Sequence, residues 1–312
     1  MCDLSISIVN TSNWVYLEPC LNSIINTVQN IDYEILVVDN CSDDNSVEKI
    51  KANFPSVILS VNKSKYGFAK NNNINLRRAS GRYLMLLNDD TLVQPNSLEN
   101  AIMFLDDHPE IGGIGCKMID PDGSFQRTSA RRLRTLYFTI LAETRINRQL
   151  NKLGTPEGNS IVEIELPQEA GMILRKEVID DIGLLDEQFF MFGEGADWCR
   201  RIKNAGWKIV LYPNCSIIHF GGVTNKKTSL KMYLQTYKSA YLYFKKESKI
   251  KALIYRLFII SMYTMKSFVI KFAKPKWKKK YSSAHEMLEY YQALVTLMLN
   301  KVDDPNYPFP TQ

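Results

Sequence analysis

The sequence predicts an α/β fold with a mostly parallel sheet and flanking helices. In the first part of the chain, short apolar runs alternate with segments of helical periodicity, which is the pattern of repeated strand-helix-strand units. The apolar runs end in polar or acidic residues, as strands do at the carboxyl edge of such a sheet, where ligands bind. With 312 residues and 45% hydrophobic content, the chain can bury one large core and carry an appendage.

Each predicted element follows from its local pattern. A strand at 4–10 precedes a helix at 14–28, in which apolar residues recur at three- and four-residue steps. Further along we expect strands at 33–39 and 57–61, a helix at 69–80, and a strand that ends at Asp89 and Asp90. Parallel pairing would gather the strand ends on one edge. That edge carries Asn10, Asp39, Asn62, Asp89 and Asp90, and it has the size of a nucleotide site.

The adjacent carboxylates of Asp89 and Asp90 close the apolar run RYLMLLNDDT. Like charges repel, and a divalent metal shared with substrate phosphates is the commonest reason for such a pair. A solvated turn is the alternative, because these residue types favour turns. The chain has no GxxxxGK[ST] loop, and residues 112–115 lack the GxGxxG spacing, which weakens ATPase and NAD interpretations. Carboxylates plus a metal suit a nucleoside diphosphate that carries a leaving group.

Several motifs resemble those of a known family. The runs SISIVN, YEILVVDNCSDDNS, NKSKYGFAKNNN and GRYLMLLNDDT resemble the donor-binding half of family 2 glycosyltransferases with a GT-A (Rossmann-like) fold. QEAGMILR, IGLLDEQFFMFGEGADWCRRIKNAGW and IIHFGG resemble acceptor-side motifs of bacterial rhamnosyltransferase-like members. The resemblance implies a catalytic domain over 1–225, with a donor half at about 1–110 and an acceptor half at about 111–225, followed by a basic, amphipathic helical region at 226–312.

This resemblance implies an inverting sugar transfer from a nucleotide diphosphate donor to a hydroxyl group. Our best expectation is dTDP-rhamnose as donor and a lipid-linked or polysaccharide acceptor in cell-surface glycan synthesis, such as cell wall or O-antigen. A UDP-hexose-using enzyme of the same fold is one alternative. A catalytically silent homologue that binds nucleotide sugars is another, because Gly195 stands where the family typically has an acid.

The resemblance also assigns roles to single residues. Asp90 is expected to ligate Mn²⁺ or Mg²⁺, and His219 is expected either to be a further ligand or to be structural. Donor contacts are expected from Asn10, Asp39, Asn62, Gly67, Phe68 and Asp89. The base is expected to be Glu194, which follows the apolar residues 189–192, with Asp197 as the alternative base or as a helix-capping carboxylate.

Four arginines cluster between residues 127 and 134. By resemblance, Arg127, Arg131 and Arg132 contact the diphosphate of the donor or of a lipid-linked acceptor, because guanidinium forks match phosphate oxygens. A solvated basic face is the alternative. The following residues, 135–160, have the least regular pattern in the body and are expected to form a lid or a wall of the acceptor cleft.

The charge distribution is asymmetric. From Gly221 onward the chain has 17 Lys+Arg against 5 Asp+Glu, which leaves 22 against 28 for the rest. The tail has helical periodicity from residue 229, and Arg256, Lys266 and Lys271 interrupt its apolar runs, so we expect no transmembrane span. Basic amphipathic helices with Trp and Tyr suit an anionic membrane surface, and packing in a homodimer is the alternative. Nucleic acid is not expected as a partner, because no recognised module is present.

The six cysteines show no paired short spacing, which predicts reduced thiols and not a disulfide framework or a zinc site. The first residues, MCDLSISIVN, have neither a basic n-region nor a long apolar h-region, so no signal peptide is expected. Together these features predict a cytoplasmic enzyme that is peripheral on the inner face of the cell membrane.

Overall fold

A computed structural model describes residues 2–144, 160–221, 229–273 and 284–309. The described residues fall into two compact units. The first comprises those within Met1–Leu133, Gln149–Asp186 and Gly195–Thr224, and the second those within Arg134–Arg148, Glu187–Glu194 and Asn225–Gln312. The expected boundary near residue 225 remains a prediction, and the second unit also includes two segments from earlier in the chain.

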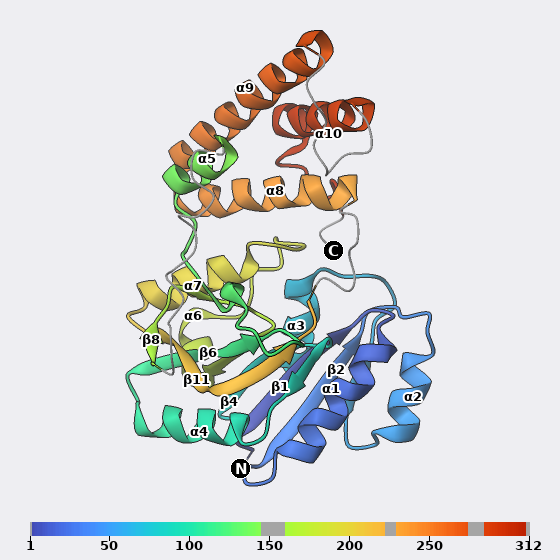
Figure 1. Ribbon diagram of the computed structural model, residues 1–312, viewed down its shortest axis with the longest axis vertical. Helices are drawn as coiled ribbons and strands as arrows, with labels where there is room; N and C mark the ends of the chain where they lie inside the picture. Colours follow the sequence, from blue (N-terminus) through green and yellow to red (C-terminus); the bar gives the residue numbers. More distant parts are fainter. Residues whose placement is uncertain (1, 145–159, 222–228, 274–283, 310–312) are drawn as a thin grey trace. The chain divides into compact units, whose positions relative to one another are not determined.

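The first unit is built on a large sheet that is mostly parallel at one side (Figure 1). Four parallel strands lie in the order β3 (Ile58–Val61), β2 (Tyr33–Asp39), β1 (Leu4–Asn10) and β4 (Tyr83–Asn88). Next to β4 lies β10 (Gly171–Arg175), which is antiparallel both to β4 and to the following strand, β6 (Ile111–Ile119). β11 (Lys208–His219) is parallel to β6. β5 (Thr91–Val93) and β8 (Val162–Glu163) both pair with β11 in antiparallel orientation. A separate small sheet pairs β7 (Ala130–Arg131) with β9 (Leu166–Pro167). The predicted α/β class and mostly parallel sheet are confirmed.

Helices connect these strands. Those of the first unit are α1 (Trp14–Thr27), α2 (Ser46–Asn53), α3 (Phe68–Leu76), α4 (Ser97–Asp107), α6 (Lys176–Ile182) and α7 (Glu194–Asn204, whose first residue belongs to the second unit), with a short 3₁₀ helix at Arg127–Ser129. The expected helix at 69–80 ends early, at Leu76. The reason is that the Ser80 N–H and hydroxyl both donate to Glu34 Oε1, at 2.7 and 2.9 Å, which draws the chain out of the helix.

The second unit contains α5 (Leu136–Thr144), α8 (Leu230–Glu247), α9 (Lys249–Ala273), α10 (Ala284–Thr296) and a π-helical turn at Leu297–Lys301. The prediction of irregular structure was wrong for 136–144, because an apolar run there follows Thr135, whose hydroxyl accepts from the Phe138 N–H at 3.2 Å and caps the helix. Residues 145–159 of that predicted lid lie outside the described residues. In the described part of the chain, Lys249–Phe272 is long and apolar enough to cross a membrane by length and composition alone, and the expectation of no transmembrane span remains a prediction.

Side chains alternate across β1, as its sequence LSISIVN predicts. Leu4, Ile6 and Ile8 are fully buried in the core that includes residues of α1 and α4. Ser7 faces the other way, toward α3, where its hydroxyl donates to Asn72 Oδ1 at 2.8 Å. Asn75 of α3 donates to the Leu36 carbonyl oxygen at 2.9 Å. Asparagine is a poor helix former, so these bonds to the strands compensate for its use and fix α3 on the sheet.

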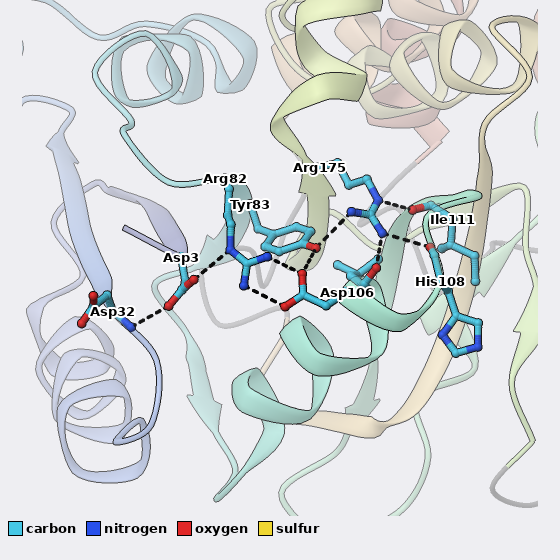
Figure 2. Close-up of polar contacts among 9 residues, drawn as sticks. Asp3, Asp32, Arg82, Tyr83, Asp106, His108, Ile111 and Arg175 are labelled. Carbon is cyan, nitrogen blue, oxygen red and sulfur yellow. Dashed lines mark hydrogen bonds and ion pairs between the residues drawn. The ribbon is translucent and has the colours of Figure 1, made fainter. Parts of the chain in front are cut away.

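A polar network joins elements at the amino end of β4 (Figure 2). Arg82 donates to Asp3 Oδ1 at 2.8 Å and pairs with Asp106, to which the Tyr83 hydroxyl also donates, at 2.7 Å. Arg175 of β10 donates to the Tyr83 hydroxyl at 3.0 Å and to backbone carbonyls at the end of α4, among them that of His108 at 2.9 Å. The guanidinium group of Arg175 thus donates to carbonyl groups that the end of α4 leaves without helical partners.

Replacing Arg175 tests this network. We expect Arg175→Met to lower the free energy of unfolding by about 2–3 kcal/mol, because it strips partners from the Tyr83 hydroxyl and from buried carbonyls. Urea denaturation followed by circular dichroism measures this. The neighbouring Lys176→Met is the control, since its ion pair with Asp180 is exposed and should contribute under about 1 kcal/mol. Equal effects of the two changes would contradict the role of Arg175.

Candidate active site

The acidic run after β4 is held on both sides by backbone hydrogen bonds. The Asn88 N–H donates to the Ala170 carbonyl at 3.2 Å, just before β10, and the Phe220 N–H donates to the Asp90 carbonyl at 3.0 Å, just after β11. The Thr91 hydroxyl donates to the Asn88 carbonyl at 2.7 Å. The backbone around Asp89 and Asp90 is therefore held by the residue before β10 on one side and by the residue after β11 on the other.

Both carboxylates of the run are poorly solvated. Asp90 is 7% exposed. Burial raises the pKa of Asp89 to about 7, and the negative charge of Asp90 adds to the rise, against a hydrogen bond with Asn13 that lowers it. A buried acidic pair of this kind is stabilised in its ionised form by a nearby cation.

His219, the last residue of β11, faces the acidic run. Its Nε2 lies 3.4 Å from Asp90 Oδ1, while its Nδ1 lies 3.0 Å from Gln126 Oε1. Gln126 is itself fixed, because its amide donates to the His219 carbonyl at 2.6 Å and to Asp120 Oδ1 at 2.7 Å. An amide oxygen beside Nδ1 favours the proton there, which leaves the Nε2 lone pair directed to the side of Asp90.

The spacing of this pair fits a metal site. Two ligands of one divalent cation, each at about 2.1 Å and at right angles, lie about 3 Å apart. No group of three or more His, Cys, Asp or Glu side chains that could hold a metal occurs among the residues that the structure describes. Asp90 and His219 could thus supply protein ligands, and the oxygens of a diphosphate or water would have to complete the shell.

The expected nucleotide-binding residues also lie together. Asp39 is 1% exposed, and its carboxylate accepts from Asn10 Nδ2 at 3.0 Å and from the Ser42 N–H at 3.0 Å. The Asn10 amide oxygen accepts in turn from the Asn13 N–H at 3.2 Å. The ends of β1 and β2 are thereby joined by two of the predicted donor-binding side chains.

A set of asparagine amides fixes the loop after β3. Asn62 Nδ2 donates to Asn71 Oδ1 at 2.7 Å and to Asn40 Oδ1 at 3.2 Å, and Asn40 Oδ1 also accepts from the Tyr66 N–H at 2.8 Å. This loop leads into Gly67, the N-cap of α3, and Phe68, its first residue. Sequence reasoning missed Asn40, although it directly follows the carboxylate that ends β2.

The arginine cluster is divided. Arg131 of β7 pairs with Glu169, with Nη2 3.1 Å from Oε2, and also donates to the Pro167 carbonyl at 3.4 Å. Arg127 and Arg132 are exposed, which matches either a phosphate contact or a solvated face. Glu169 was not among the predicted site residues. It comes close to Arg131 only through the pairing of β7 with β9, which the sequence did not reveal.

The two predicted base candidates have different surroundings. Asp197 is completely buried, and its oxygens accept from Arg200 at 2.8 Å and from Arg201 at 3.0 Å. Arg201 also donates to the carbonyls of residues 182 and 184, so the Asp197 pair anchors α7, which supports the structural alternative for Asp197. Glu194, the first residue of α7, is 5% exposed.

Comparisons with known proteins identify the family of this chain. The sequence profile described as "Glycosyl transferase family 2" matches residues 5–172, more than half of the chain. The chain is 23% identical over 222 residues to the O-antigen biosynthesis protein RfbC of Myxococcus xanthus, a match that covers 69% of this chain and 17% of that protein. It is 22% identical over 237 residues to the N-acetylglucosaminyl-diphospho-decaprenol L-rhamnosyltransferase of Mycobacterium tuberculosis (strain CDC 1551 / Oshkosh), with 67% and 73% covered.

A solved structure supports the fold. The mannosyltransferase PcManGT from Pyrobaculum calidifontis, in complex with GDP-Man and Mn²⁺, superposes with a TM-score of 0.57 at 15% identity, over 96% of this chain and 87% of that one. At this identity the likeness establishes the architecture alone. From the family match and the sheet together, we conclude that the chain belongs to glycosyl transferase family 2 and is a glycosyltransferase with the GT-A fold.

Proposed function

We propose that this glycosyltransferase moves rhamnose, with inversion, from dTDP-rhamnose to a hydroxyl of a lipid-linked or polysaccharide acceptor in cell-surface glycan synthesis. One observation carries the proposal: Asp90 and His219 face each other at 3.4 Å on the sheet edge where Asn10 and Asp39 also meet. The choice of donor and acceptor rests on the relatives, one of which is named as a rhamnosyltransferase that uses a diphospho-decaprenol acceptor. The same fold holds GDP-Man elsewhere, so other donors are natural controls.

In this proposal Asp90 and His219 hold Mn²⁺ or Mg²⁺, and Asp89 faces the ribose or the metal. A bound divalent cation would supply positive charge to the diphosphate leaving group. Asp39 would accept a hydrogen bond from the nucleobase or the ribose, and Asn10 would donate one to them. Asn62, Gly67 and Phe68 would flank the nucleotide and sugar, and Arg127 and Arg132 would contact a diphosphate.

The two acids that the sequence offers as proton acceptor differ in their surroundings. Asp197 is an unsuitable base because two arginines occupy its carboxylate. Glu194 remains a candidate on sequence grounds. If neither Glu194 nor another acid can act, the chain would be a silent nucleotide-sugar binder, which would bind donor without turning it over.

The metal assignment is tested by calorimetric titration of dTDP-rhamnose, UDP-glucose, UDP-N-acetylglucosamine and GDP-mannose, each with Mn²⁺ and with EDTA. We expect one donor to bind only with Mn²⁺, and Asp90→Asn to weaken that binding by at least about tenfold, because a ligand is lost. Asp107→Asn, at an exposed position of α4, is the matched control. Unchanged affinity in Asp90→Asn would refute the metal role, and a product that retains the donor's anomeric configuration by NMR would refute inversion.

We also propose that the second unit binds an anionic membrane surface through α9. Large apolar side chains, each 44–72% exposed, recur at helical spacing along one face of this helix: Ile250, Leu253, Ile254, Leu257, Met265, Phe268, Val269 and Phe272. Exposed Lys249 and Lys271 stand near its two ends, and α9 contains no carboxylate. The lysine-rich segment 274–280, which follows α9, lies outside the described residues. An apolar stripe bounded by cations matches the interface of an anionic bilayer.

Packing of the opposite face favours a helix that lies in the membrane surface over one that crosses it. Arg256 donates from that side to the carbonyls of Met298 and Leu299, at 2.6 and 2.7 Å. The Tyr263 hydroxyl lies 2.5 Å from that of Tyr237 in α8. A crossing helix would expose these bonded polar groups to lipid, whereas an interfacial helix buries only the apolar stripe. The proposed location is thus cytoplasmic and membrane-peripheral.

Sedimentation of the full chain with vesicles tests the α9 face. We expect binding to vesicles of phosphatidylglycerol and phosphatidylcholine, and at least about tenfold weaker binding in Leu257→Asp/Phe268→Asp, because two apolar side chains no longer enter the bilayer. Met103→Asp is the matched control, an exposed apolar residue on α4. Unaltered sedimentation of the double variant would refute the proposal. If the unaltered protein is a dimer and the double variant is a monomer, the stripe would be assigned to self-association.

A further inference from the structure

Gly195 leaves open the space that the Glu169 side chain occupies. A Cβ added at this position would lie 1.9 Å from Glu169 Oε1 and 2.5 Å from Glu169 Cδ. Carbon and oxygen atoms cannot approach that closely without bonding, so any side chain at 195 would displace the Glu169 carboxylate. The space beside the first turn of α7 is therefore occupied by an acid that comes from another part of the chain.

The loop that carries Glu169 is fixed at the metal-binding edge. It forms a turn in which the Gly171 N–H donates to the Gln168 carbonyl at 3.2 Å. On one side of Glu169, Gln168 Nε2 lies 3.3 Å from His219 Nδ1. On the other side, the Ala170 carbonyl accepts from the Asn88 N–H at 3.2 Å. Glu169 thus lies between a residue that is close to His219 and a residue whose carbonyl is bonded to the acidic run.

The Glu169 carboxylate has the properties that a proton acceptor needs. Its Oε2 is paired with Arg131 at 3.1 Å. Its Oε1 accepts no hydrogen bond from the residues that the structure describes, and 23% of the side chain is exposed. One oxygen is therefore held by a cation while the other is available to a hydroxyl group.

We propose that Glu169 is the general base of this enzyme, in place of Glu194. The assignment rests on the proposed glycosyl transfer. As the acceptor hydroxyl attacks, its O–H bond breaks and the proton passes to Glu169 Oε1. The new bond forms between the oxygen of the acceptor hydroxyl and the anomeric carbon, while the bond from the anomeric carbon to the diphosphate breaks and the nucleoside diphosphate leaves with the electron pair. Gly195 serves as the positioning residue that leaves room for this carboxylate.

The first test uses the nucleotide sugar that the unaltered protein binds, with Mn²⁺, and measures both its affinity by calorimetry and release of the nucleoside diphosphate. We expect Glu169→Gln to keep the affinity and to lower turnover by about 10²–10⁴-fold. Glu177→Gln, an exposed carboxylate of α6, is the control. The assignment is overturned if Glu169→Gln turns over at the rate of the unaltered protein. It is also overturned if Glu194→Gln loses turnover while Glu169→Gln does not.

The second test uses the shared space. Gly195→Asp alone should lower turnover, because it displaces Glu169. Glu169→Ala empties this space, so the double variant Glu169→Ala/Gly195→Asp should turn over at least ten times faster than Glu169→Ala alone. Glu169→Ala/Gly195→Asn has nearly the same shape without a basic carboxylate and should recover nothing. Equal turnover of these two double variants overturns the proposal. Absence of donor binding by the unaltered protein would instead overturn the proposed function on which it rests.

Discussion

The repulsion between two adjacent, poorly solvated carboxylates is the constraint that the catalytic unit has to accommodate. Asp89 and Asp90 lie at the end of a buried strand, and burial already raises the pKa of Asp89 to about 7. Backbone hydrogen bonds hold the run so that the two acids cannot separate. In the proposed metal site a divalent cation would offset this repulsion, and His219, whose Nε2 lies 3.4 Å from Asp90 Oδ1, would be a second ligand.

The arrangement of strands explains why these groups meet. Antiparallel β10 lies between the parallel strands of the first half and those of the second, so it brings the turn that precedes it against Asn88. β11 carries His219 to the same edge, where β5 pairs with it directly after the acidic run. The fixed position of the acidic run therefore depends on segments from later in the chain, and in the proposed metal site one of the two ligands, His219, also comes from there.

Local patterns were enough to predict the first four strands, the acidic run and the position of Asn10 and Asp39 on one edge of the sheet, because each of these follows from a short segment and from parallel strand order. The contacts that sequence reasoning missed join distant segments. Arg131 meets Glu169 only through the pairing of β7 with β9, and Glu169 meets Gly195 only because α7 starts beside the turn before β10. Hydrophobic periodicity carries no information on such contacts.

Gly195 illustrates how a missing side chain can be misread. Taken from the sequence alone, it indicates the loss of an acid and therefore a weakened or silent enzyme. In the structure the same glycine makes room for a carboxylate from another loop, so the local charge beside α7 is retained while its source in the chain has changed. Because the Arg131 pair holds that carboxylate on one oxygen only, the other oxygen is the proton acceptor in the proposed transfer, so in this proposal glycine at 195 changes which residue is the base and does not remove the base from the site.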